Sequence, residues 1–327
     1  FFAGIIIMLL AGIIILASVK NYEPEEEITV DNDTSGNSDV INSAVVDVMI
    51  WNIGYCGLDA GMDFFYDGGE SVRPEKEQSL KNLEGVVRFL KANDSIDFIL
   101  LQEVDIDSRR SYHINQNEII DQEHPVHQSF TGINYQVPYV PLPLKEPMGK
   151  VKSGLQTLSA FQPSQSVRWS FPGSFGWPTR LFMLDRCFLV NRYPVPGGEL
   201  LIINTHNSAY DDGSLRIEQM HYLRSFILRE HEKGNYVMVG GDWNQCPPGI
   251  QTHIEGYRFD TTGFIEIPSD FLPEGWKWVW DDQVPTNRRV SKPYEQETSL
   301  TTIIDYFLLS PNLDFNYIET VNMDFIY

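Results

Sequence analysis

Short apolar runs rich in β-branched residues restrict the fold of this chain more than any other feature of its sequence. Each run ends at a polar residue or glycine, which is typical of strands buried inside a sheet. The runs are Val45–Ile53, Ile96–Val104, Cys187–Val190, Leu200–Thr205, Tyr236–Gly240 and Ile303–Leu309. Between them, apolar residues recur at helical spacing over Glu75–Asn93 and Ser214–His231. Strands interspersed with helices predict an α/β fold. Residues 105–180 are rich in Pro, Gly and aromatic residues, and there we expect long loops over one face.

Polar side chains lie at the ends of these predicted strands, where a sheet brings neighbouring strand ends together. They are Asn52, Glu103, His206, Asp242, Asn244 and Asp305. Carboxylate and amide oxygens at one rim suit a hard divalent cation such as Mg²⁺. Amide and imidazole groups beside it can donate to a charged oxyanion. The pattern therefore favours metal-assisted attack of water on a phosphate ester.

Five motifs occur in a fixed order along the chain. They are W-N-I at 51–53, L-L-Q-E-V-D at 100–105, N-T-H at 204–206, G-G-D-W-N at 240–244 and I-D-Y-F-L-L-S at 304–310. With these motifs the sequence resembles the endonuclease/exonuclease/phosphatase superfamily, which includes deoxyribonuclease-like and neutral-sphingomyelinase-like phosphoesterases. The resemblance runs from about Val45 to the end of the chain. It implies a four-layer α/β sandwich, in which two packed mixed sheets are flanked by helices.

The resemblance also implies roles for the residues of the metal site. Glu103 would be the main Mg²⁺ ligand, with Mn²⁺ as an alternative cation. Asn52 would assist as a second metal ligand or by orienting the phosphate.

The catalytic roles follow from the same resemblance. Asp242 would position or deprotonate the attacking water, and Asn244 would bind a phosphoryl oxygen. His206 would donate to the transition-state oxyanion, and Asp305 would orient a histidine. That histidine belongs to the closing Ser-Asp-His motif of the family, yet no histidine follows Asp305 in this sequence. We expect that the catalytic domain, residues 44–327, is truncated at its C-terminus, while loss of the motif remains the alternative.

The first nineteen residues, Phe1–Val19, contain no charged residue. A membrane-spanning helix needs ~20 apolar residues, so residues 1–19 predict a transmembrane anchor, with a signal peptide as the second interpretation. Residues 20–43 are acidic and polar and predict a solvated linker. Because Lys20 is the one basic residue near the membrane exit, we expect the catalytic domain to be extracytoplasmic.

The composition narrows the function classes. The net charge of −21 disfavours binding of nucleic acid by blanket phosphate neutralisation. The three cysteines form no CxxC pair, which excludes a zinc ribbon and a disulfide-dense scaffold. We therefore expect a membrane-tethered, monomeric, Mg²⁺-dependent phosphoesterase that hydrolyses a phosphate mono- or diester by metal-activated water. Its substrate would be a lipid headgroup, a small phosphodiester or nucleic acid. The alternatives are a nuclease of the same superfamily and a non-catalytic binding domain that lost the terminal motif.

Overall fold

The computed structural model describes residues 2–30, 40–209, 211 and 213–327. The α-helices are α1 Phe2–Val19, α2 Lys76–Ala92, α3 Gln116–Glu123 and α4 Ser214–Glu232. The short 3₁₀ helices are η1 Gly54–Cys56, η2 Phe65–Asp67, η3 Arg109–Ser111 and η4 Thr179–Phe182. The strands are β1 Glu27–Thr29, β2 Val48–Asn52, β3 Phe98–Asp105, β4 Gln128–Val140, β5 Gly149–Ser159, β6 Gln165–Ser170, β7 Cys187–Val195, β8 Gly198–His206, β9 Tyr236–Asp242, β10 Arg258–Phe259, β11 Lys277–Val279, β12 Asn287–Arg288, β13 Leu300–Thr302 and β14 Asp305–Leu309.

Two large mixed sheets make up the body of the molecule. One has the strand order β1-β6-β7-β8-β9-β14-β11 and the other β2-β3-β5-β4, while β10-β13-β12 forms a small third sheet. In the large sheets, β2 pairs parallel with β3 and β8 with β9, and the other neighbours are antiparallel. The large sheets pack face to face, with contacts of β2 and β3 against β9 and of β5 against β8.

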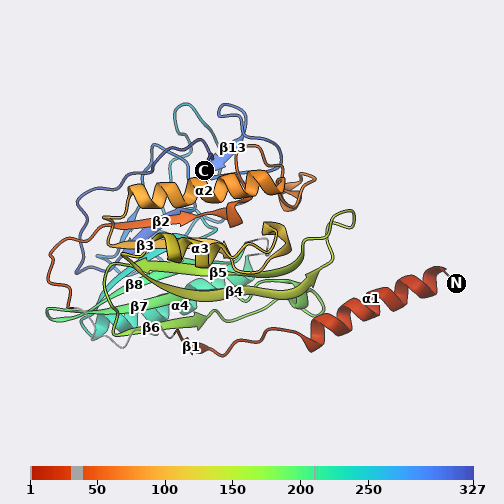
Figure 1. Ribbon diagram of the computed structural model, residues 1–327. Helices are drawn as coiled ribbons and strands as arrows, with labels where there is room; N and C mark the ends of the chain where they lie inside the picture. The colour runs from red at the N-terminus through yellow and green to blue at the C-terminus, as the bar shows by residue number, and fades with distance from the viewer. Residues whose placement is uncertain (1, 31–39, 210, 212) are drawn as a thin grey trace.

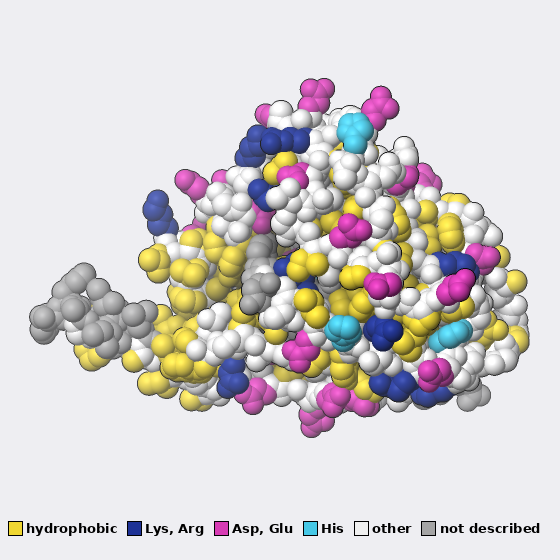
Figure 2. Space-filling view, turned by 180° about the vertical axis from the view of Figure 1, so that it is seen from behind, with side chains coloured by type: hydrophobic (Ala, Val, Ile, Leu, Met, Phe, Trp, Pro, Cys, Tyr) yellow, Lys and Arg dark blue, Asp and Glu magenta, His cyan; other side chains and the backbone are white. Residues whose placement is uncertain are grey.

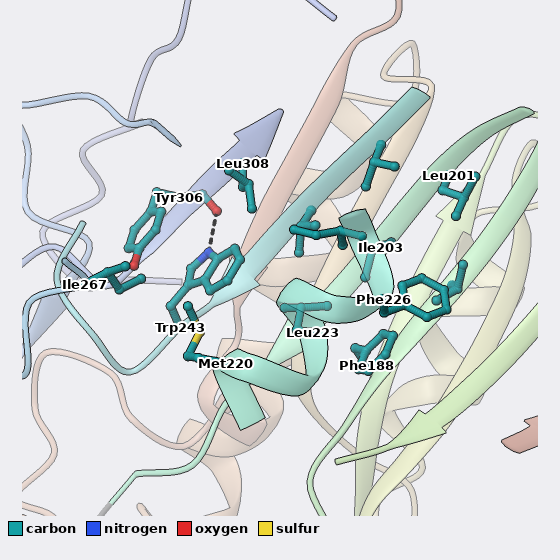
Figure 3. Packing of buried hydrophobic residues seen from close by; sticks show 14 of the residues in the cluster. Phe188, Leu201, Ile203, Met220, Leu223, Phe226, Trp243, Ile267, Tyr306 and Leu308 are labelled. Atoms are coloured by element: carbon teal, nitrogen blue, oxygen red, sulfur yellow. Dashed lines mark hydrogen bonds between the residues drawn. The ribbon is translucent and has the colours of Figure 1, made fainter. Parts of the chain in front are cut away.

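The alternation of side chains along β8 shows why the predicted strands are apolar throughout. Leu200 and Ile202 pack between the sheets against Phe98 of β3, whereas Leu201 and Ile203 pack under α4 (Figure 3). Both faces of such a strand are buried, so both need apolar residues. Helices α2 and α3 cover the other sheet (Figure 1). The predicted α/β fold of packed mixed sheets flanked by helices is confirmed.

A buried pair of aromatic rings fixes the end of β9 against β14. Trp243 and Tyr306 are fully buried and stacked, with ring centroids 5.4 Å apart. The indole N–H of Trp243 donates to the backbone oxygen of Tyr306 at 2.9 Å (Figure 3). The pairing of the two strands sets Asp305 opposite Asp242. This packing therefore brings two of the predicted site residues together.

The prediction of long loops over residues 105–180 is wrong, because this segment contains α3, β4, β5 and β6. Strands β4 and β5 form a long hairpin, and their register shifts between Ile133 and Tyr135 and again between Val137 and Val140. Bulges of this kind interrupt the two-residue alternation of side chains. The hairpin therefore lacks the sequence pattern of a regular strand pair.

The N-terminal segment forms α1, which projects from one end of the body (Figure 1). In the part of the chain that the structure describes, no helix is long and apolar enough to span a membrane. The transmembrane anchor predicted over residues 1–19 is therefore not supported. Within the predicted acidic linker, Glu27–Thr29 pairs with β6 as an edge strand, and residues 31–39 lie outside the described residues.

Candidate active site

All the polar residues predicted at the strand ends line one cleft, whose volume is about 1480 Å³. Asn52 ends β2, His206 ends β8 and Asp242 ends β9, while Asp305 begins the antiparallel strand β14. Glu103 lies near the end of β3, and Asn244 follows β9. Since these strands end at the same rim of the packed sheets, residues far apart in sequence meet there.

Asn52 connects two carboxylates that come from different sheets. Its amide nitrogen donates to Asp242 Oδ2 at 2.9 Å and lies 3.3 Å from Glu103 Oε1. Its amide oxygen accepts a hydrogen bond from the backbone N–H of Gly54 at 2.9 Å. The oxygen is therefore directed to the backbone and the nitrogen to the carboxylates. The amide nitrogen of Asn52 thus positions both carboxylates, while its oxygen keeps one lone pair for another partner.

The backbone of β3 is distorted at Glu103. The residue has φ of 54°, a left-handed conformation that is uncommon outside glycine. The pairing of β3 with β5 shifts register between Leu101 and Val104, which is a bulge around Glu103. A bulge re-aims a side chain, and the Glu103 carboxylate reaches the cleft with 23% of the side chain exposed.

His206 and Asp242 form a buried pair. The distance from His206 Nε2 to Asp242 Oδ2 is 3.5 Å, and His206 Nδ1 has no hydrogen-bond partner among the described residues. Burial, with the positive charges of Arg186 and Arg110, holds the pKa of His206 well below its ordinary value. Burial raises the pKa of Asp242 to about 6, against the hydrogen bonds from Asn52 and the backbone of Asn244. The imidazole is therefore neutral near pH 7.

Asp305 and Asn244 complete the rim. In the described part of the chain, Asp305 Oδ1 has no hydrogen-bond partner. Burial and the neighbouring charge of Asp242 raise the pKa of Asp305 well above its usual range. The Asn244 side chain donates to the backbone oxygen of Asn207 at 2.9 Å, and its backbone N–H donates to Asp242 Oδ1 at 2.8 Å. Asn244 therefore holds Asp242 in place through its backbone and keeps one amide hydrogen for another acceptor.

Sequence reasoning missed Arg110, which lies beside Glu103. Its guanidinium is buried, forms a bidentate ion pair with Asp105 at 2.9 Å, and lies 3.7 Å from Glu103 Oε2. It also stacks on the ring of Tyr55, 3.9 Å from the centroid. Arg110 follows the L-L-Q-E-V-D motif by five residues, and no periodicity marked it, because its burial depends on a turn that folds back under β3.

The donor set fits a cation with few protein ligands. Within residues 2–30, 40–209, 211 and 213–327, no group of three or more His, Cys, Asp or Glu side chains is arranged to hold a metal ion. Mg²⁺ in phosphoryl-transfer sites commonly takes one or two carboxylates and completes its shell with water and substrate oxygens. The half-buried carboxylate of Glu103 reaches the cleft beside the buried Asp242 and Asp305, and it suits that mode of binding. It does not suit a closed structural zinc site.

Comparison with known proteins gives the following similarities. Residues 49–322 match the model of the Endonuclease/Exonuclease/phosphatase family. The structure resembles TDP2 from Caenorhabditis elegans, with 16% identity, 82% of this chain covered and a TM-score of 0.52. It also resembles a mannosyl-6-phosphatase from Bacteroides thetaiotaomicron VPI-5482, with 14% identity, coverage of 82% of this chain and 86% of that chain, and a TM-score of 0.47.

The similarity to C. elegans TDP2 concerns the fold alone, and the similarity to the phosphatase is too weak to bear on function. The chain spans 65% of the length of the TDP2 chain that it matches. No curated protein matches the sequence.

Proposed function

The chain belongs to the endonuclease/exonuclease/phosphatase family, and we propose that it is a Mg²⁺-dependent phosphoesterase that hydrolyses a phosphate mono- or diester with water. Mn²⁺ is the alternative cation. One observation carries the proposal: the amide nitrogen of Asn52 lies against the carboxylates of Glu103 and Asp242 at the rim of one cleft. Asn52 would then hold the cation-binding carboxylate of Glu103 at a fixed distance from the proton-accepting carboxylate of Asp242, across the two sheets.

Glu103 would hold the cation, because its carboxylate reaches into the cleft and a second carboxylate lies nearby. Bound Mg²⁺ would neutralise phosphate charge and polarise the phosphorus centre. Asn52 keeps Glu103 in position through the hydrogen bond described above.

Asp242 would accept the proton of the attacking water. A pKa of about 6 suits a general base that works near neutral pH. Its two oxygens are fixed by Asn52 and by the backbone of Asn244. Water attack then forms the new phosphorus–oxygen bond as the ester oxygen departs.

His206 and Asn244 would stabilise the oxyanion. In the neutral imidazole only one nitrogen carries a proton, and because Nε2 faces the carboxylate of Asp242 that proton lies on Nε2. His206 would donate it to a phosphoryl oxygen bound beside Asp242. The second amide hydrogen of Asn244 can donate to the same group. Donors placed where charge develops lower the barrier.

A non-catalytic binding domain is the second candidate, and the unpartnered oxygen of Asp305 favours it. The family resemblance assigns Asp305 the orientation of a histidine, and no imidazole among the described residues is hydrogen-bonded to Asp305 Oδ1. A protein that lost this pair would keep the cleft and the cation but turn over no ester.

The proposal is tested by measuring hydrolysis of p-nitrophenyl phosphate, a monoester, and of bis-p-nitrophenyl phosphate, a diester. Each is assayed with Mg²⁺, with Mn²⁺ and with EDTA. We expect hydrolysis that EDTA abolishes. Glu103→Gln should weaken Mg²⁺ binding in calorimetry by more than ~10-fold. Loss of a group that only supports a metal ligand already costs about that much affinity, and a direct ligand should cost more. Exposed Glu70 provides the matched control, Glu70→Gln. Equal Mg²⁺ affinity in Glu103→Gln and the parent would reject the assignment of Glu103, whereas Mg²⁺ binding without any hydrolysis would favour the binding domain.

A further inference from the structure

One end of the molecule exposes large apolar side chains from three separate segments, which we call the apolar end. The segments are α1, the β4–β5 turn (residues 141–148) and the loop that contains η4 (residues 171–183). Leu144 is 84% exposed, Trp177 65% and Leu142 49%. In α1, exposed side chains include Met8 and Ile15.

The three segments lie next to one another. Helix α1 contacts β4 and η4, and β4 contacts η4. Figure 1 shows α1 and the β4–β5 turn at the same end of the body. Figure 2 shows hydrophobic side chains gathered over the end from which α1 projects. Contiguous exposed apolar surface of this kind marks an interaction site.

The charge of the apolar end is opposite to that of the whole chain. In the three segments of the apolar end the basic residues are Lys145 and Arg180, and the one acidic residue is Glu146. Glu146 is paired with Arg73 at 3.1 Å. The net charge of the chain is −21. A basic fringe around apolar and indole side chains complements an anionic lipid surface.

The apolar end also adjoins the catalytic cleft. Met148, Phe175 and Met183 belong to the segments that form it, and they line the same cleft as Glu103 and Asp242. The hydroxyl of Tyr135 on β4 donates to the backbone oxygen of Phe182 at 3.0 Å, which ties the hairpin to the η4 loop. A surface bound at this end therefore lies next to residues that line the cleft.

We propose that the apolar end docks on the surface of a bilayer that contains anionic lipids, with the β4–β5 turn and the η4 loop inserted among the headgroups. Binding strength then comes from buried apolar area plus attraction to anionic headgroups. A second copy of the chain is a poorer occupant, because a two-fold contact would bring the same basic residues together. The cleft would meet the phosphate of a lipid headgroup, an extension that rests on the proposed function.

Sedimentation of the full chain with vesicles tests the docking. We expect binding to phosphatidylcholine vesicles that contain phosphatidylserine and weaker binding to vesicles of phosphatidylcholine alone. Leu144→Glu/Trp177→Glu should weaken binding to the mixed vesicles by about tenfold or more, since each change removes a large apolar group. The matched control is Val126→Glu/Ile217→Glu, which places the same charges on side chains that are 59% and 52% exposed outside the apolar end. The control should bind like the parent.

Three results would overturn the docking: a parent chain that stays in the supernatant with both vesicles, a control as impaired as the double variant, or a concentration-dependent dimer that Leu144→Glu/Trp177→Glu dissociates. Hydrolysis of bis-p-nitrophenyl phosphate, followed in parallel, separates the two proposals. Docking without hydrolysis leaves the surface assignment intact and rejects the phosphoesterase. Hydrolysis without docking does the reverse.

Discussion

Removing the charge of Glu230 should destabilise the protein, and the effect should depend on pH. Glu230 is buried on α4, and its carboxylate accepts hydrogen bonds from Arg192 of β7 at 2.8 and 2.9 Å. Lys233 donates to it at 2.8 Å and Asn235 at 2.9 Å. Burial alone would raise the pKa of Glu230, but these hydrogen bonds outweigh burial and lower it to about 2. The carboxylate therefore ties α4 to the strand beside β8, which carries His206.

The size of the effect follows from this shift. A fall in pKa from 4.5 to about 2 corresponds to roughly 3 kcal/mol at 1.36 kcal/mol per unit. Lys233 is 62% exposed, so solvent screens part of the interaction, and we expect Glu230→Gln to lower the free energy of unfolding by about 2–3 kcal/mol at pH 7. Because the folded-state pKa is depressed, this stability is fully present above pH 4.5 and is lost as the pH falls towards 2.

Urea denaturation followed by circular dichroism, between pH 7 and pH 3, measures the difference between the two proteins. The control is Glu84→Gln on the exposed face of α2, which should change the free energy of unfolding by no more than about 0.5 kcal/mol. The parent should exceed Glu230→Gln by the predicted amount at pH 7, and the gap should narrow at pH 3. A gap that is absent at pH 7, or that is equally large at both pH values, would refute the electrostatic reasoning and indicate a packing effect.

Two further predictions concern the core and the support of the site. Trp243→Phe should lower the free energy of unfolding by about 1–3 kcal/mol in urea denaturation, because it removes buried volume and the donor to Tyr306. The control, Trp177→Phe, should leave the free energy of unfolding almost unchanged. Equal losses in the two variants would contradict the packing described for Trp243. Arg110→Met should cost about 3–5 kcal/mol because it leaves the buried carboxylate of Asp105 unpaired. Adding Asp105→Leu should recover much of that loss, and a double variant no more stable than Arg110→Met would show that the ion pair is not the cause.

The sequence alone determined the helices and strands whose apolar residues form a regular pattern. The helices predicted over Glu75–Asn93 and Ser214–His231 occur as α2 and α4, and each predicted apolar run overlaps one of the central strands. The family was also readable from the sequence, because its motifs sit at the ends of those strands. Residues at strand ends converge whenever the strands pair, so local sequence was enough to gather them at one rim.

Tertiary structure decided what depends on contacts between distant segments. The β4–β5 hairpin was missed because its bulges break the alternation that marks a strand. The direction of the Asn52 amide depends on carboxylates 51 and 190 residues away. Arg110 reads as an ordinary surface charge until the chain folds it against Asp105 and Tyr55. Periodicity records only which face of an element is buried, whereas the orientation of a polar side chain is set by the partners that the whole fold brings to it.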